Sequence, residues 1–304
     1  MLGIMVEIAA GPRITLETLL ARYPNTAALR DGKLPSNLID FAFDDVKPAN
    51  NGFKPYVREL RYDCGELAIV TFLQAKAAGK PLVLLPATIM ARFQQDTIAY
   101  NHDRGLLSPG DLTGKRIGVR AYTQTTGAWV RGILEEEYGV DLARVTTVSF
   151  EDPHVAEYTD PPNVERAAPG KTLEGMLLAG EIDAAIFGPN LPKQPGFRHL
   201  IPDLDATVQA WHRKHAIVPV NHLMVVKSAL SLHRPDVVRE LYRLLVLSRL
   251  AAGPPGPIDM QPFGVAALRR SLETIIDYSW RQKLIPHRIT VDELFDDHMR
   301  ALGA

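Results

Sequence analysis

Short apolar runs rich in β-branched residues alternate with amphipathic stretches along most of this chain. Leu67, Val70 and Leu73 recur at helical spacing in one such stretch, and Pro235 opens another at the first-turn position that proline favours. This alternation predicts an α/β protein with largely parallel sheets. The predicted strands span residues 4–8, 38–43, 82–85, 116–119, 145–150, 182–187 and 223–226.

Two further signals mark helix ends. Gly139 is expected to end a helix whose apolar face includes Val130 and Leu134. Thr290 and Glu293 have the spacing of a capping box, which predicts the start of the last helix.

The length of the chain fits two cores better than one. At about 150 residues per domain, 304 residues predict two domains. Turn-forming residues precede new strands at 108–115 and 215–219, so we expect the chain to cross between lobes there. One predicted lobe holds residues 1–100 and 217–304, and the other holds residues 101–216.

Charge and cysteine content exclude several classes of protein. The 34 Lys and Arg residues are balanced by 35 Asp and Glu, which provides no basic surface for a nucleic-acid backbone. The single cysteine, Cys64, excludes an internal disulfide and a cysteine-based zinc cluster. The first residues lack a positive leader, and no apolar window approaches the roughly 18–20 residues that cross a bilayer. We therefore expect a cytoplasmic protein without nucleic-acid or membrane partners.

Hydroxyl groups gather where the predicted strand 116–119 gives way to a helix. The carboxyl ends of parallel strands and the N–H groups of helix N-termini together form anion sites. Thr123, Thr125 and Thr126 lie in this turn, and Trp129 follows on the helix. They are suited to holding an oxyanion; the alternative is a solvated, Thr-rich turn.

Three arginines lie near such strand ends. Arg120 and Arg131 flank the Thr-rich turn, although Arg131 would alternatively extend over the surface. Arg92 stands beside Phe93 after the strand at 82–85, where it is suited to clamping a planar carboxylate. An ordinary surface ion pair is the alternative for Arg92.

Two histidines are candidate proton donors. His154 follows Glu151 and Asp152 directly after a predicted strand, and these groups suit a proton shuttle or a metal. Ordinary turn chemistry fits the same residues. His222, beside Asn221, precedes a predicted buried strand, where it is either a general acid or a structural histidine.

Two weaker signals complete the set of candidate site residues. Asp63 and Glu66 have the spacing of a helix cap and its partner, and the same carboxylates are alternatively directed toward a ligand. Gly188 follows the strand at 182–187 and permits close approach to the backbone.

Several of these motifs, taken in order, resemble the 4,5-dihydroxyphthalate decarboxylase family, which is similar in fold to the type 2 periplasmic binding proteins. The resemblance covers nearly the whole chain. The D-L-x-G-K motif alone is shared with many solute-binding proteins, whereas Arg92-Phe93 and the segment 129–134 are more specific for the decarboxylases. The motifs that carry it are residues 61–67, 86–93, 111–119, the Thr-rich turn with 129–134, and 219–222.

The resemblance implies two lobes joined by crossover strands, with the ligand in a cleft between them. It also implies the reaction, which is loss of one carboxylate from 4,5-dihydroxyphthalate to give protocatechuate. Ring protonation needs a general acid, and His222 is the first candidate and His154 the second. Arg92 with Thr125 and Thr126 would hold the retained carboxylate. The remaining candidate binding residues are Asp63, Glu66, Phe93, Arg120, Thr123, Trp129, Arg131, Gly188 and Asn221.

The reaction requires no organic cofactor. The sequence is compatible with a bound divalent metal and with a homo-oligomer. A second hypothesis has the same fold bind or sense a small carboxylate without catalysis, since fold does not dictate function. The two hypotheses differ in whether a proton donor faces the ligand.

Overall fold

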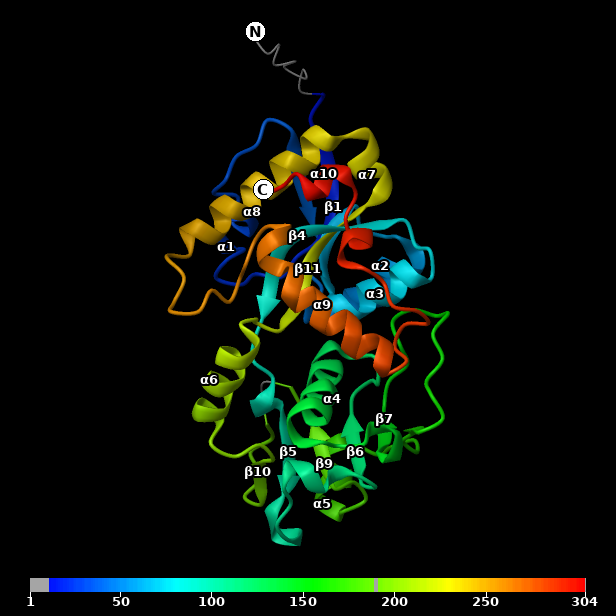
Figure 1. Cartoon of the computed structure of the whole chain (residues 1–304). Helices are drawn as coiled ribbons and strands as arrows, with labels where there is room; N and C mark the ends of the chain where they lie inside the picture. Colours follow the sequence, from blue (N-terminus) through cyan, green and yellow to red (C-terminus); the bar gives the residue numbers. More distant parts are fainter. Residues whose placement is uncertain (1–10, 189–190, 304) are drawn as a thin grey trace.

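The computed structural model describes residues 11–188 and 191–303, and their strands form two sheets (Figure 1). The first sheet has five strands in the order β2-β1-β3-β11-β4. β11 runs antiparallel to both of its neighbours, whereas β1, β2 and β3 are parallel. The strands are β1 (Ile14–Leu19), β2 (Ile39–Phe43), β3 (Cys64–Ala68), β4 (Leu82–Ala91) and β11 (Val220–Lys227).

The second sheet has six strands in the order β10-β5-β9-β6-β7-β8. β6 to β9 pair in parallel, and β5 pairs antiparallel with β9 and β10. The strands are β5 (Ile98–Asn101), β6 (Arg116–Val119), β7 (Thr146–Ser149), β8 (Val164–Arg166), β9 (Ala184–Ile186) and β10 (Phe197–His199). The lobes built on the two sheets confirm the predicted two-lobed α/β fold, while the residue boundaries of the lobes stay a prediction.

Helices cover both sheets, and two of them lie where the lobes meet. Figure 1 shows α9 running diagonally above α4, between the first sheet and the second. The helices are α1 (Ala27–Arg30), α2 (Phe53–Glu59), α3 (Ile69–Ala77), α4 (Thr125–Tyr138), α5 (Leu173–Ala179), α6 (Leu204–His215), α7 (Ser228–His233), α8 (Pro235–Ala251), α9 (Val265–Arg281) and α10 (Asp297–Arg300). Within the described ranges, no helix combines the length and the apolar character needed to cross a membrane.

Helix α4 contributes to the cores of both lobes. Trp129 and Ile133 pack in the core of the first lobe, whereas Val130 and Leu134 pack in that of the second. Gly132 lets α4 approach α9 closely, because a Cβ at this position would lie 2.1 Å from the Tyr278 ring. The two lobes are therefore joined by packed side chains as well as by the crossing chain.

The sequence located several elements and misplaced one. The strand predicted at 116–119 has those bounds, Gly139 ends α4 in the left-handed conformation, and Pro235 opens α8. The Thr290–Glu293 capping box is present, although it opens a short 3-10 helix. The strand predicted at 4–8 lies outside the described residues.

The prediction that a helix begins at Asp63 is wrong, because the helix begins later in the chain. Residues Cys64–Ala68 form β3, and α3 begins only at Ile69. All five residues of β3 are buried, so the strand lacks the alternation of apolar and polar residues that would reveal it. Asp63 therefore caps no helix; it accepts hydrogen bonds from the Glu17 amide and from Lys227.

Candidate active site

A buried carboxylate holds a histidine at the end of the first sheet. Glu66 on β3 is fully buried, and its Oε2 lies 2.6 Å from Nδ1 of His222 on the neighbouring strand β11. The Tyr23 hydroxyl donates to Oε2 at 3.0 Å, and the Ala21 amide donates to Oε1 at 2.6 Å. These contacts fix the carboxylate and, through it, the imidazole ring. Nε2 of His222 has no protein partner among the residues that the structure describes.

A phenylalanine ring separates His222 from the second histidine. The Phe53 ring packs edge-on against both imidazoles, with centroid distances of 5.2 Å to His222 and 5.6 Å to His154. Nδ1 of His154 lies 2.8 Å from the Thr71 hydroxyl on α3. The two histidines, 68 positions apart in the sequence, thus belong to one cluster.

The surroundings of His154 disfavour its protonated form. Burial, together with the nearby positive charges of Arg120, Lys54 and Arg58, lowers the pKa of His154 to about 3. His154 is therefore neutral at neutral pH. Its environment is cationic, as expected around a bound anion.

The N-termini of two helices meet beside these histidines. The Thr125 hydroxyl, in the first residue of α4, accepts a hydrogen bond of 3.2 Å from the amide of Val70 in the first turn of α3. α3 follows directly after Ala68, which pairs with His222 across the sheet. Both helices direct their positive dipole ends to this region, which suits a carboxylate.

Arg92 lies at the same helix start. Its Nη2 donates to the Thr126 hydroxyl at 2.7 Å, and its Nε is buried without a protein partner within the described part of the chain. Asn221 lies 3.5 Å from the same hydroxyl, and a Cβ on Gly188 would lie 3.8 Å from the Arg92 guanidinium. Burial lowers the pKa of Arg92. The structure thus gathers Arg92, Thr126, Asn221 and Gly188 as one group.

Three predicted site residues serve packing in this structure. Trp129 is fully buried, and its indole N–H donates to the Val220 carbonyl at 2.9 Å. Phe93 packs edge-on against Trp211 of α6. Arg131 does not extend over the surface, since it is buried and stacked on the Tyr122 ring at 4.0 Å.

Three other predicted site residues, Arg120, Thr123 and Asp63, lie at different places relative to the two histidines. Arg120 pairs with the Glu151 carboxylate at 2.6 Å and remains close enough to lower the pKa of His154. Thr123 is buried in the turn before α4. Asp63, at the opposite end of β3 from Ala68, pairs with Lys227.

Sequence reasoning missed four residues of the cluster. Phe53 lies on a helix that no pattern predicted, and Thr71 is hidden within the helix that begins at Ile69. Tyr23 and Gln94 reach the site from irregular segments, where Gln94 Nε2 donates to the Asn221 side chain at 2.8 Å. Only the three-dimensional pairing of strands brings these residues together.

The residues predicted to bind a metal are not arranged as ligands. His154 directs Nδ1 to Thr71, Glu151 pairs with Arg120, and Asp152 is exposed. In the ranges 11–188 and 191–303, three acidic or histidine ligand atoms come within 4.8 Å of one another only at Glu136, Glu137 and His215. That group lies on α4 and α6, and Lys214 already pairs with Glu137.

Comparison with solved structures agrees with the two-lobed fold. The alkanesulfonate-binding protein SsuA from Xanthomonas axonopodis pv. citri, bound to MOPS, matches with a TM-score of 0.58 at 16% identity, over 94% of this chain and 99% of that one. A mutant of the enzyme DSZB in complex with biphenyl-2-sulfinic acid matches with a TM-score of 0.57 at 16% identity, over 94% and 97%. The fold therefore occurs in both binding proteins and an enzyme.

In sequence, this chain is more similar to a group of enzymes than to the solved structures described above. Residues 46–165 match the family described as NMT1/THI5 like. A 4,5-dihydroxyphthalate decarboxylase from Comamonas testosteroni is 31% identical over 253 residues, covering 79% of this chain and 76% of that protein. A 4,5-dihydroxyphthalate decarboxylase from Pseudomonas putida is 32% identical over 214 residues, covering 66% and 82%. Because the similarity extends over most of both proteins, this chain belongs to the 4,5-dihydroxyphthalate decarboxylase family.

Proposed function

We propose that this protein is a carboxy-lyase that converts 4,5-dihydroxyphthalate to protocatechuate and CO₂. The observation that carries the proposal is the buried Glu66 carboxylate on Nδ1 of His222, beside two helix N-termini. A binding protein needs the helix ends and the cations. It does not need an imidazole whose Nδ1 is held by a carboxylate and whose Nε2 points away from that carboxylate. Two relatives that bear this enzyme's name support the same substrate.

In the proposed reaction, His222 transfers a proton from Nε2 to the ring carbon that bears the departing carboxylate. A C–H bond forms, and the C–C bond then breaks, so that its electron pair restores the aromatic ring as CO₂ leaves. The hydroxyl para to this carbon stabilises the dearomatised intermediate. Glu66 keeps the ring of His222 oriented and offsets the positive charge of the imidazolium before transfer. Solvent then returns the proton to His222.

The two histidines have different proposed roles. The pKa of about 3 makes His154 a poor proton donor at neutral pH, which favours His222. Neutral His154 would instead position the substrate together with Phe53, which contacts both imidazoles. His154 is thus a binding residue in this proposal.

The dicarboxylate would be held by the cationic groups around the cluster. Arg92 and the Thr126 hydroxyl, already 2.7 Å apart, would hold the retained carboxylate with the amides that begin α4. Closure of the lobes around the ring would exclude water from the departing carboxylate and strengthen these contacts. The ring hydroxyls stabilise the intermediate themselves, so the proposed chemistry uses no organic cofactor.

The test is turnover of 4,5-dihydroxyphthalate by the purified chain in D₂O. We expect one equivalent of CO₂ and one of protocatechuate, with one deuterium on the carbon that lost the carboxylate. The rate should be the same after dialysis against EDTA. Saturable binding without CO₂ release would contradict the proposal and favour a solute-binding role.

A further inference from the structure

Two donors share one oxygen of the buried Glu66 carboxylate. Oε2 lies 2.6 Å from Nδ1 of His222 and accepts a hydrogen bond of 3.0 Å from the Tyr23 hydroxyl. The other oxygen, Oε1, accepts from the Ala21 amide at 2.6 Å. Because Glu66 is fully buried, bulk solvent does not reach the carboxylate. The negative charge on Oε2 is therefore divided between the imidazole and a phenol.

A tight turn after β1 holds Tyr23 against this oxygen. The Thr26 hydroxyl, which is fully buried, accepts from the Tyr23 amide at 2.8 Å and donates to the Ala21 carbonyl at 2.7 Å. Since β1 pairs with β3, this turn begins beside Glu66 and supplies the Ala21 amide to Oε1 as well. The position of the Tyr23 hydroxyl is thus fixed by the backbone of the turn.

The Tyr23 hydroxyl acts as a donor to the carboxylate. Burial and the neighbouring charge of Glu66 raise the pKa of Tyr23 far above its usual value, so the hydroxyl keeps its proton. A carboxylate that accepts from a neutral hydroxyl remains charged, but it offers less negative charge to a second partner on the same oxygen. The imidazolium form of His222 is then held less strongly, so that it gives up the proton on Nε2 more readily.

The other groups that face the imidazole of His222 do not share this oxygen. His154 lies across the Phe53 ring and is neutral at neutral pH. On the adjacent strand β4, His222 pairs with Met90, which is uncharged. Within the described residues, none of the cations that act on His154 forms an ion pair with Glu66; these cations are Lys54, Arg58 and Arg120.

We infer that Tyr23 is a positioning residue that makes His222 a stronger proton donor by sharing Glu66 Oε2. This role rests on the proposed function, in which His222 protonates the ring of the substrate. Without the hydroxyl, the full charge of Oε2 would face the imidazolium, and the proton would leave it less readily. The ring would still be oriented, because the carboxylate keeps its contacts with Nδ1 of His222 and with the Ala21 amide.

NMR of the full chain with ¹³C-labelled histidine tests this role without turnover. The His222 ring resonance, identified by its loss in His222→Asn, is followed through a pH titration of the natural chain and of Tyr23→Phe. We expect its pH midpoint to rise by at least about 0.5 unit in Tyr23→Phe, which is about a threefold gain in proton affinity. 3-Fluorotyrosine at position 23 has a more acidic hydroxyl that donates more strongly, so it should move the midpoint down.

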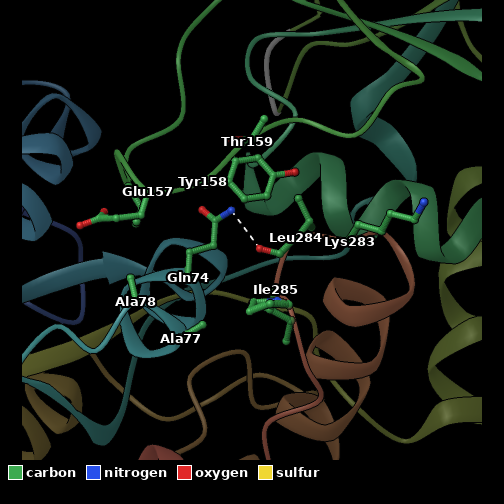
Figure 2. Close-up of a pocket in the computed structure, with 11 residues that line it drawn as sticks. Gln74, Ala77, Ala78, Glu157, Tyr158, Thr159, Lys283, Leu284 and Ile285 are labelled. Atoms are coloured by element: carbon green, nitrogen blue, oxygen red, sulfur yellow. Dashed lines mark hydrogen bonds between the residues drawn. The ribbon is translucent and has the colours of Figure 1, made fainter.

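Two other tyrosines provide matched controls. Tyr62 donates to a carboxylate oxygen of Asp44 at 2.8 Å, and it precedes β3 at the end of the strand away from the imidazole. Tyr158 lines a separate cavity of about 320 Å³, where Figure 2 shows its ring beside Gln74, and its hydroxyl has no partner among the described residues. Tyr62→Phe and Tyr158→Phe should leave the midpoint within about 0.2 unit of the natural value.

Single-turnover CO₂ release adds a second readout, since a merely structural role would not move its pH profile. In Tyr23→Phe, the limb on which the rate falls with rising pH should move up with the NMR midpoint. The rate on the plateau below that limb should fall about twofold, with substrate affinity unchanged.

An unchanged or lower NMR midpoint in Tyr23→Phe, or an equal rise in Tyr62→Phe, would overturn the role of Tyr23. A rise confined to Tyr23→Phe in a natural chain that releases no CO₂ would support this role and contradict the decarboxylase instead.

Discussion

The Glu66 carboxylate accepts from three donors at once, and a neutral amide cannot replace it. Glu66→Gln keeps the size of the side chain but places an N–H₂ group against at least one donor among the Ala21 amide, the Tyr23 hydroxyl and His222. We expect the free energy of unfolding to fall by about 1–3 kcal/mol in urea titrations. CO₂ release should fall at least about tenfold, because the His222 ring loses its orientation. Glu273→Gln, at an exposed position on α9, is the control and should change neither quantity.

The low pKa of His154 predicts that the free energy of unfolding falls as the pH is lowered. Its pKa is about 3 in the folded protein and about 6.5 when unfolded, so the unfolded chain binds an extra proton between these values. The stability contributed by neutral His154 is thus present above about pH 6.5 and is lost as the pH falls toward 3. We expect the loss between pH 7 and pH 4 to exceed that of His154→Gln by about 2–4 kcal/mol in urea titrations. Parallel pH profiles for the two proteins would contradict the proposed burial of the imidazole.

At the scale of single residues, the sequence indicated which side chains could take part in the chemistry, but not which of them are in contact. His222, Arg92 and Thr126 are candidates because they follow or border predicted strands, and Glu66 is one because of its spacing from Asp63 at a predicted helix start. That Glu66 contacts His222 could not be predicted, since their strands pair across 156 positions of sequence. Trp129 and Phe93 pack against protein groups in this structure, and their part in binding stays a prediction, because an aromatic side chain beside a polar turn has the same pattern whether it packs inward or faces a ligand.

At the scale of elements, the packing of α4 on α9 depends on one small residue. Gly132→Ala places a Cβ 2.1 Å from the Tyr278 ring, so the helices must separate or the ring must move. We expect a loss of about 1–3 kcal/mol in the free energy of unfolding, measured in urea. Gly256→Ala is the matched control, because nothing lies within 4 Å of a Cβ built there. Equal stability of the two variants would contradict the packing described.

Elements with strong periodicity were predictable, and fully buried or short ones were not. α8 has an amphipathic face and begins at Pro235, where the sequence indicated a helix start. β3 is buried on both faces, and β8 and β10 have three residues each, too few for a pattern. Missing β3 had a consequence for the site, because it misplaced the N-terminus of α3 that faces His222.

At the scale of the whole molecule, ligand binding between the lobes should raise thermal stability. A ligand at 100 times its Kd adds about 2.7 kcal/mol to the free energy of unfolding if it binds only the folded protein. We expect 4,5-dihydroxyphthalate to raise the Tm of the natural chain and of Arg213→Ala, an exposed arginine on α6. The Tm of Arg92→Ala should rise far less at the same concentration, because the substrate loses the guanidinium proposed to hold its retained carboxylate. An equal rise in both variants would show that Arg92 does not bind the substrate.

The transfer of a proton from His222 to the ring is tested most directly by single-turnover CO₂ release. With enzyme in excess over 4,5-dihydroxyphthalate, His222→Asn should be slower than the natural chain by at least about a hundredfold, with substrate affinity changed less than about threefold. His199→Asn, at an exposed histidine on β10, should react at the natural rate. CO₂ release by His222→Asn within about threefold of the natural rate would contradict proton donation by His222.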